Sequence, residues 1–171
     1  GQRQAVIGDM LPPQLISARM ISETTARFIF DSPAEPDPDS FQVSRGIKVI
    51  SALQEDSRVD ITLSSAPPPG EQVMIQGSFW GEGKSRVQLS VSLYGYNPNP
   101  AELAINEFTT RGSETNPDRV ELFVLSGGNT AGITLYDGTP LEYRQRKILP
   151  NVDVGQGEYI IVHMSPSCDE Y

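Results

Sequence analysis

The strict alternation of apolar and polar residues is the feature that most limits what this chain can fold into. It is clearest over residues 87–93, where Val87, Leu89, Val91 and Leu93 are separated by Gln88, Ser90 and Ser92, and residues 59–63 show the same pattern. Successive side chains of a β-strand point to opposite faces, so this period of two indicates strands with one buried face. No segment carries an amphipathic helical stripe over three turns. We therefore predict an all-β fold.

Proline and glycine divide the chain into many short segments. The 14 Pro and 15 Gly separate runs that are rich in β-branched and aromatic residues, a spacing that favours β-sandwiches. Residues 97–100 read Asn-Pro-Asn-Pro, and two X-Pro bonds keep such a linker extended. We predict a flexible arm at residues 1–11, a first domain at 12–96, a linker at 97–100 and a second domain at 101–171. In the second domain, Gly127-Gly128-Asn129 predicts a hairpin turn.

The charge balance and the cysteine count exclude several classes of protein. The formal net charge is −9 and Lys and Arg form no cluster, which argues against binding to nucleic acid or to an anionic membrane surface. No apolar run reaches the about 20 residues of a membrane-spanning helix, so we predict no direct membrane insertion. Cys168 is the single cysteine, which cannot form an internal disulfide or a structural zinc site. The chain begins with Gly1, which fits either a removed export segment or an arbitrary boundary.

Residues 12–96 contain two motifs of a known kind. Ser22-Glu23-Thr24-Thr25 precedes Phe28-Ile29-Phe30, and the strand Val59-Asp60-Ile61-Thr62-Leu63 follows later. On these motifs the segment resembles the bacterial Ig-like domains of surface-layer proteins and adhesins. In that family a turn usually follows in which an Asp precedes a Gly-Asn pair by two residues. Here that turn reads Trp80-Gly81-Glu82-Gly83-Lys84, so the motif is absent. The resemblance implies a non-catalytic spacer or adhesive module.

Residues 101–171 contain three motifs in a fixed order. They are Ile105-Asn106-Glu107-Phe108, then Val120-Glu121-Leu122, and finally Gly157-Glu158-Tyr159-Ile160-Ile161-Val162. On these motifs the segment resembles the bacterial lamin-tail-like domain, and the resemblance implies an Ig-like β-sandwich fold. Where the family has Asn after the second motif, this chain has Phe123. Sandwiches of this type need about 100 residues, so we expect the domain to be incomplete and its open sheet edge to favour pairing with another chain. Together the two resemblances predict two tandem Ig-like β-sandwich domains.

Two glutamates recur in the lamin-tail-like motifs. Glu107 and Glu121 offer a carboxylate pair for acid–base chemistry of the kind that glycosidases use. No histidine, nucleophile or oxyanion element accompanies them, so we interpret Asn106, Glu107 and Glu121 as structural residues. In this interpretation the glutamates bond to the backbone or to Arg119. We predict no catalytic residue and no enzyme activity.

Two further groups are candidate binding residues. Asp31, Asp37 and Asp39 crowd one loop with Glu35, and such hard oxygen ligands could hold Ca²⁺, although the EF-hand spacing is absent and a solvated acidic loop is the simpler reading. Asp56 and Asp60 are weaker metal candidates. Trp80, Tyr94 and Tyr96 are candidates for a sugar- or peptide-binding platform. The alternative is that one of Phe79 and Trp80 is core and that the two tyrosines pack the domains together.

These observations predict a non-catalytic module of an exported bacterial protein. We expect it to be extracellular, on the cell surface or periplasmic, and to contact a protein or a glycan of the cell envelope through loops and sheet edges. A lipid anchor on the natural precursor is compatible with this hypothesis, and no cofactor is required. One alternative is an accessory module of a larger secreted hydrolase. The other is an enzyme that uses Glu107 and Glu121.

Overall fold

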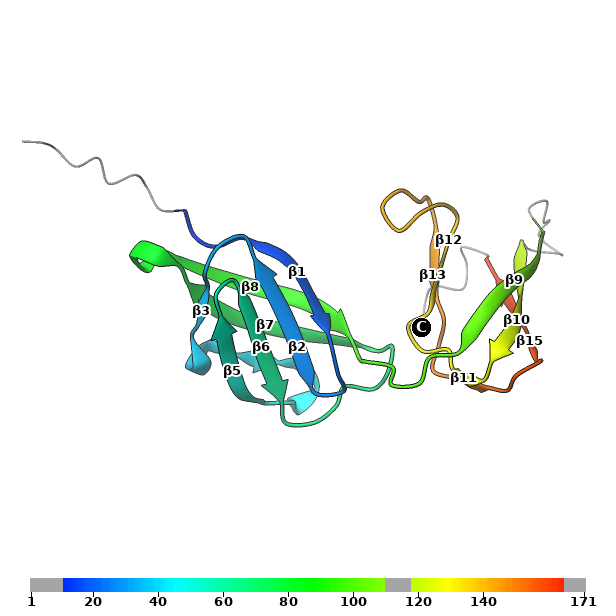
Figure 1. Ribbon diagram of the computed structural model, residues 1–171, viewed down its shortest axis with the longest axis horizontal. Helices are drawn as coiled ribbons and strands as arrows, with labels where there is room; N and C mark the ends of the chain where they lie inside the picture. Colours follow the sequence, from blue (N-terminus) through cyan, green and yellow to red (C-terminus); the bar gives the residue numbers. More distant parts are fainter. Residues whose placement is uncertain (1–10, 110–117, 165–171) are drawn as a thin grey trace, which may run out of the picture. The chain divides into compact units, whose positions relative to one another are not determined.

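The computed structural model describes residues 11–109 and 118–164, and these residues fall into two compact units that divide between Tyr96 and Asn97 (Figure 1). Among the described residues there are strands and three short 3-10 helices, and none lies in an α-helix, so the prediction of an all-β fold is confirmed. No helix in these ranges is long and apolar enough to cross a membrane. Most of the predicted arm and Cys168 lie outside the described residues.

The first unit contains two antiparallel sheets. One has the strand order β1-β2-β6-β5, with bounds Leu15–Met20, Thr25–Phe30, Arg58–Leu63 and Val49–Glu55. In the other, β7 (Gln72–Trp80) pairs with β8 (Arg86–Tyr94) on one side and with two short strands, β3 (Glu35–Pro36) and β4 (Gln42–Val43), on the other. Figure 1 shows β7 and β8 behind the first sheet. The 3-10 helices are η1 (Pro38–Ser40), η2 (Ser44–Gly46) and η3 (Glu82–Lys84).

One hydrophobic core lies between these two sheets. In β2 and β6 every second residue is buried, as the alternation in the sequence predicts. Phe79 of β7 meets them from the other sheet, with its ring centroid 5.8 Å from that of Phe28 and 4.8 Å from that of Phe30. A Cβ on Gly77 would lie only 2.3 Å from the Phe41 ring, so glycine at this position makes room for the ring. The two sheets are thus held together mainly by burial of apolar surface.

The acidic loop at residues 31–40 is more regular than its proline content suggests. It contains β3, which pairs with the end of β7, and η1, which follows at once. Pro36 is tolerated in a strand because β3 lies at the edge of its sheet, where a missing N–H breaks no ladder. This region is therefore fixed to β7.

The second unit contains one three-stranded sheet and two short strand pairs. The sheet has the order β15-β10-β9, with bounds Tyr159–His163, Arg119–Ser126 and Glu102–Thr109. The short pairs are β11 (Gly128–Asn129) with β14 (Asp153–Val154), and β12 (Thr134–Tyr136) with β13 (Arg146–Ile148). Leu122, Leu149 and Val162 form the centre of its small core.

The predicted hairpin turn at Gly127-Gly128-Asn129 is wrong. Gly128 and Asn129 form β11, which pairs with a strand more than twenty residues later in the chain. A Cβ on Gly128 would lie 2.7 Å from the carbonyl oxygen of Asn99, so this glycine serves a close approach of two backbones. Glycine in a turn and glycine at a close backbone contact give the same sequence signal.

Candidate binding face

The three-stranded sheet of the second unit places its side chains on two faces. In β10, Val120, Leu122 and Val124 point toward the core, and Leu122 and Val124 are almost fully buried. The alternating residues of β10 and their cross-strand partners lie on the opposite side, which we call the outer face. It comprises Arg119 with Thr109 and His163, Glu121 with Glu107 and Ile161, and Phe123 with Ala104 and Tyr159.

A β-bulge brings the three motif residues together on this outer face. Glu121 pairs with Glu107 and Leu122 pairs with Ile105, so Asn106 is an extra residue in β9. The side-chain amide of Asn106 donates a hydrogen bond of 2.7 Å to Oε1 of Glu121. Glu121 is therefore oriented by Asn106 and not, as we expected, by Arg119 or the backbone. The two glutamates are cross-strand neighbours, which concentrates negative charge at one point of the face.

An exposed apolar cluster lies beside this carboxylate pair. The rings of Phe123 and Tyr159 stand in neighbouring strands with their centroids 5.1 Å apart. Tyr159 is 59% exposed and Ile161 is 52% exposed, and Leu125 of β10 is also exposed. Contiguous exposed apolar side chains are typical of interaction surfaces, so the cluster is a candidate binding site. We refer to Phe123, Leu125, Tyr159 and Ile161 as the apolar cluster.

The apolar cluster was not predicted from the sequence. The strand Tyr159–His163 is apolar at four successive positions, so its period does not show which residues are buried. The signal was nonetheless present, because a continuous apolar run in a sheet with only one covered face must expose part of itself. His163, an exposed residue opposite Arg119, borders the cluster.

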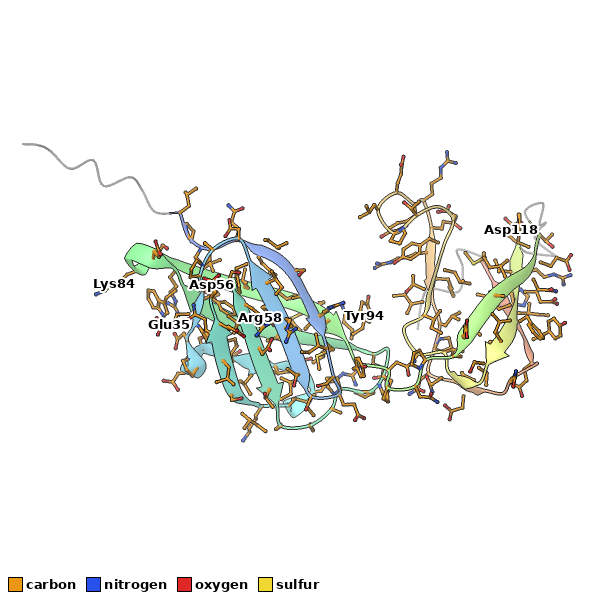
Figure 2. All side chains as sticks on the ribbon, in the orientation of Figure 1. Glu35, Asp56, Arg58, Lys84, Tyr94 and Asp118 are labelled. Atoms are coloured by element: carbon orange, nitrogen blue, oxygen red, sulfur yellow. The ribbon has the colours of Figure 1, made fainter. Side chains whose placement is uncertain are left out.

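The structure does not gather Trp80 and Tyr94 into one platform. Trp80 pairs with Arg86 at one end of the β7–β8 hairpin, and Tyr94 pairs with Gln72 at the other end. Eight residues of strand separate the two rungs, which corresponds to about 26 Å. Figure 2 shows Tyr94 at the far end of β8 from Lys84, which belongs to the turn beside Trp80. Tyr96 lies two residues beyond Tyr94 and is partly exposed like it.

Trp80 belongs to a polar cluster that fixes the acidic loop. The guanidinium of Arg86 lies 5.3 Å from the centre of the Trp80 ring and donates a hydrogen bond of 2.9 Å to the hydroxyl of Ser78. The same guanidinium is 3.7 Å from a carboxylate oxygen of Asp37. This set of contacts accounts for Trp80 and Asp37 without a ligand.

The acidic residues proposed for Ca²⁺ are dispersed among different partners. Asp31 accepts hydrogen bonds from the backbone N–H of Gln14, at 2.8 Å, and from the hydroxyl of Ser32. Asp37 faces Arg86, and Asp39 lies in η1. Within residues 11–109 and 118–164, no three or more His, Cys, Asp or Glu side chains form a group that could hold a metal ion.

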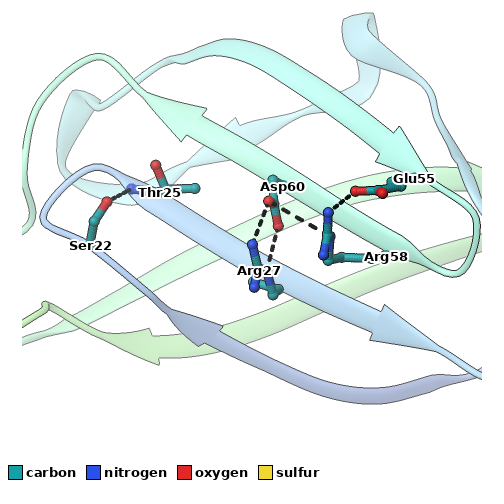
Figure 3. A network of polar contacts seen from close by, with 6 residues as sticks. All are labelled: Ser22, Thr25, Arg27, Glu55, Arg58 and Asp60. Carbon is teal, nitrogen blue, oxygen red and sulfur yellow. Dashed lines mark hydrogen bonds and ion pairs between the residues drawn. The ribbon is translucent and has the colours of Figure 1, made fainter.

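Asp60 has a structural partner on the neighbouring strand of the first unit. Nε and a terminal nitrogen of Arg27 each donate a hydrogen bond of 2.8 Å to the Asp60 carboxylate (Figure 3). These hydrogen bonds, supported by the charges of Arg27 and Arg58, lower the pKa of Asp60. Arg58 also forms an ion pair with Glu55. The planar fork of Arg27 thus joins β2 to β6 outside the core.

The β12–β13 hairpin carries a second exposed group of side chains, which was not predicted from the sequence. The ring of Tyr143 lies 5.0 Å from that of Tyr136 and 5.9 Å from the guanidinium of Arg146, and Leu141 at the tip is 98% exposed. The carboxylate of Asp137 accepts hydrogen bonds from the backbone N–H groups of Arg144 and Gln145, and these bonds lower its pKa. The loop between β12 and β13 is therefore held by its own hydrogen bonds.

Comparison with known proteins identifies one bacterial homologue. A protein of Treponema pallidum (strain Nichols), named only as an uncharacterized protein, is 25% identical over 164 residues. The alignment covers 91% of this chain and 41% of the relative, so the chain spans about two fifths of the length of that protein. A family model described as a protein second domain matches residues 101–171. The chain is homologous to a Treponema protein, and its second unit coincides closely with the matched domain.

Proposed function

We propose that this chain is a non-catalytic binding module of an exported bacterial protein, and that the outer face of the β9-β10-β15 sheet contacts a protein of the cell envelope. In this proposal the first unit is an Ig-like β-sandwich that acts as a spacer, and the second is a lamin-tail-like domain. Two antiparallel sheets around one core support the first assignment. The order of motifs on β9, β10 and β15 supports the second.

The exposed apolar cluster is the observation that carries the proposal. Protein-binding surfaces combine large aromatic and aliphatic side chains with a polar rim. Phe123, Tyr159 and Ile161 provide the apolar part, while Glu121 and Arg119 of the same strand face provide polar neighbours. A flat sheet face also suits a partner that presents a broad surface more than it suits a small molecule, which needs a concave pocket.

A protein partner fits the outer face better than a glycan does. Sugar rings stack on exposed aromatic rings, whereas Ile161 and Leu125 offer aliphatic surface that gives no such stacking. Tyr159 is the one strongly exposed aromatic ring of the cluster. Binding to a glycan array that Tyr159→Ala abolishes would favour the glycan instead.

An accessory module of a larger secreted hydrolase is the second candidate. The Treponema relative is more than twice as long as the matched segment, which leaves room for further domains in a protein of this kind. An enzyme built on Glu107 and Glu121 receives less support. Asn106 holds one of the two carboxylates, and the other, Glu107, is exposed to solvent.

The test compares two charge substitutions at exposed isoleucines. Ile161→Lys places a cation in the apolar cluster, and Ile50→Lys places one on β5 of the first unit, where Ile50 is exposed to a similar degree. We expect Ile161→Lys to abolish photo-crosslinking of the chain to one defined protein in an envelope fraction, and Ile50→Lys to leave it unchanged. Equal crosslinking by both variants, with both correctly folded by circular dichroism, would contradict the proposed face.

A further inference from the structure

The strand β8 has one side that is not paired. It forms a continuous ladder with β7 from Trp80–Arg86 to Gln72–Tyr94, and none of these nine residue pairs is shifted in register. Among the described residues β7 is its only hydrogen-bonded strand partner, and β1 of the other sheet approaches β8 without forming a ladder. Val87, Leu89 and Val91 of β8 pack against the core but stay partly exposed. A strand added at the unpaired edge would extend the sheet beside these side chains.

The other long edge strands of the first unit carry features that discourage pairing. The register of β1 is shifted between Leu15 and Ser17, and that of β5 is shifted between Val49 and Ser51. Such bulges bend an edge and break its regular row of backbone groups. The strands β3 and β4 are only two residues long. Of the described edges in this unit, β8 alone is long and regular.

The stretch between Arg86 and Tyr94 also lacks the residues that usually protect an edge. Residues 87–93 contain no charged residue and no proline, whereas natural edges are commonly blocked by lysine, proline or inward-pointing charge. The outward side chains are Gln88, Ser90 and Ser92, which are small or uncharged and able to form hydrogen bonds. Two copies of an acidic chain can therefore approach along this strand without direct repulsion.

We propose that β8 pairs antiparallel with β8 of a second copy of this chain, with Ser90 on the twofold axis. The sequence is complementary to itself in this register. Val87 then faces Leu93 of the second copy and Leu89 faces Val91, while Gln88 faces Ser92 on the outer side. Arg86 lies opposite Tyr94 at both ends, while its guanidinium keeps its contacts with Ser78 and Trp80. The seven inner residues of each strand, 87–93, find a partner of matching character.

The symmetry of the contact explains why a second copy is the expected occupant. A twofold interface requires one surface patch to be complementary to itself, and a regularly alternating strand without charged residues at positions 87–93 meets this requirement, with the axis at Ser90 bringing all nine residues into the ladder. A shift of one residue would place the apolar side of one strand next to the polar side of the other. The joined sheet buries a small area, so the dimer should be weak, and added salt should strengthen it because each chain carries a net charge of −9.

Sedimentation equilibrium of the full chain tests the proposal. We expect the average mass to rise from 18.7 kDa toward twice that value as concentration increases to about 1 mM. Ser90→Glu and Ser90→Lys should each remain monomeric, because they place like charges opposite each other at the axis. An equimolar mixture of the two variants should restore the dimer. Met74→Glu adds the same charge to the same sheet face but on β7, and should dimerise like the unchanged chain.

Disulfide trapping tests the register separately. In a Cys168→Ser background, Ser90→Cys places two thiols across the axis, where paired Cα atoms lie about 4.5–5.5 Å apart and a disulfide can form. Gln88→Cys is the matched control, because the two cysteines would be four residues out of register and about 14 Å apart.

A monomer at every concentration, or equal crosslinking by the two cysteine variants, would overturn the proposal. A dimer that both Ser90 variants preserve would do the same. None of these results bears on the outer face of the second unit, whose test uses crosslinking to a different protein. The two proposals can therefore fail independently.

Discussion

Replacing Phe79 by alanine should be among the most damaging single changes to the first unit. Its ring is 1% exposed and lies within 6 Å of the rings of Phe28, Phe30 and Phe41, measured between centroids. Burial of a phenylalanine ring removes on the order of 150 Å² of apolar surface from water, which at about 25 cal/mol per Å² amounts to about 4 kcal/mol. Deleting a buried ring typically costs about 3–5 kcal/mol once the cavity is included. We therefore expect the free energy of unfolding to fall by about 4 kcal/mol.

Urea denaturation followed by tryptophan fluorescence measures this loss directly. Trp80 is the single tryptophan and follows Phe79 in β7, so its signal reports unfolding of the first unit alone. With a slope of about 1.5 kcal/mol per molar urea, a loss of about 4 kcal/mol lowers the midpoint by about 2.5 M. Phe79→Leu keeps an apolar side chain and should lose only about 1–1.5 kcal/mol, so it stays measurable if the alanine variant does not fold.

The matched control is Met74→Ala in the same strand. Met74 points to the opposite side of β7 and is 42% exposed, so its truncation should cost less than about 1 kcal/mol. A Phe79→Ala variant that loses no more stability than Met74→Ala would refute the reasoning, since it would mean that the two sheets do not share the core described above. A large change in the dependence of the free energy of unfolding on urea concentration would instead mean that the unfolded state had changed.

Two further predictions concern the same unit. Gly77→Ala should lower the free energy of unfolding by about 1–3 kcal/mol, because the new methyl group displaces the Phe41 ring. Gly46→Asn is the control, because no atom lies within 4 Å of a Cβ at that position. In thermal melts the Gly77→Ala variant should have the lower midpoint of the two. The pKa of Asp60 is lowered in the folded chain, so its stabilising contribution is present above the ordinary value of 3.8 and is lost as the pH falls through the folded value. Asp60→Asn should therefore reduce the loss of stability on acidification, measured as urea midpoints between neutral and acidic pH; an unchanged pH profile would contradict the role of Arg27.

The strands of the first unit were predictable because each buries one face only. The alternation at Val59, Ile61 and Leu63 is visible in the sequence, and all three side chains are buried as it predicts. The same rule predicted that one of Phe79 and Trp80 would be core, and the structure buries Phe79 and leaves Trp80 partly exposed. Burial of a regular apolar stripe needs no knowledge of the partner strand, which is why local pattern was sufficient here.

The candidate sites depended on information that local pattern does not contain. Trp80 and Tyr94 were grouped because they are close in sequence, but the hairpin between them sends them to opposite ends of the sheet. The outer face needed the pairing of β10 with β15, which joins Phe123 to a tyrosine thirty-six positions later. Long-range register decides such neighbours, and a single sequence fixes it only weakly where both faces of a strand are apolar.

The extra residue at Asn106 sets the phase of the whole strand β9. Leu103 and Phe108 both lie across from core-side residues of β10, although an odd number of positions separates them. If Asn106 took a place in the ladder instead of bulging, Glu107 would share a face with Leu122 and the carboxylate pair would not exist. A related chain that lacks the residue at this position would keep Ile105 opposite Leu122 and Glu107 opposite Glu121 in a regular ladder, and would lose only the amide that holds Glu121. A gap at residue 106 is therefore a change in chain length that moves no other side chain of β9 to the opposite face of the sheet.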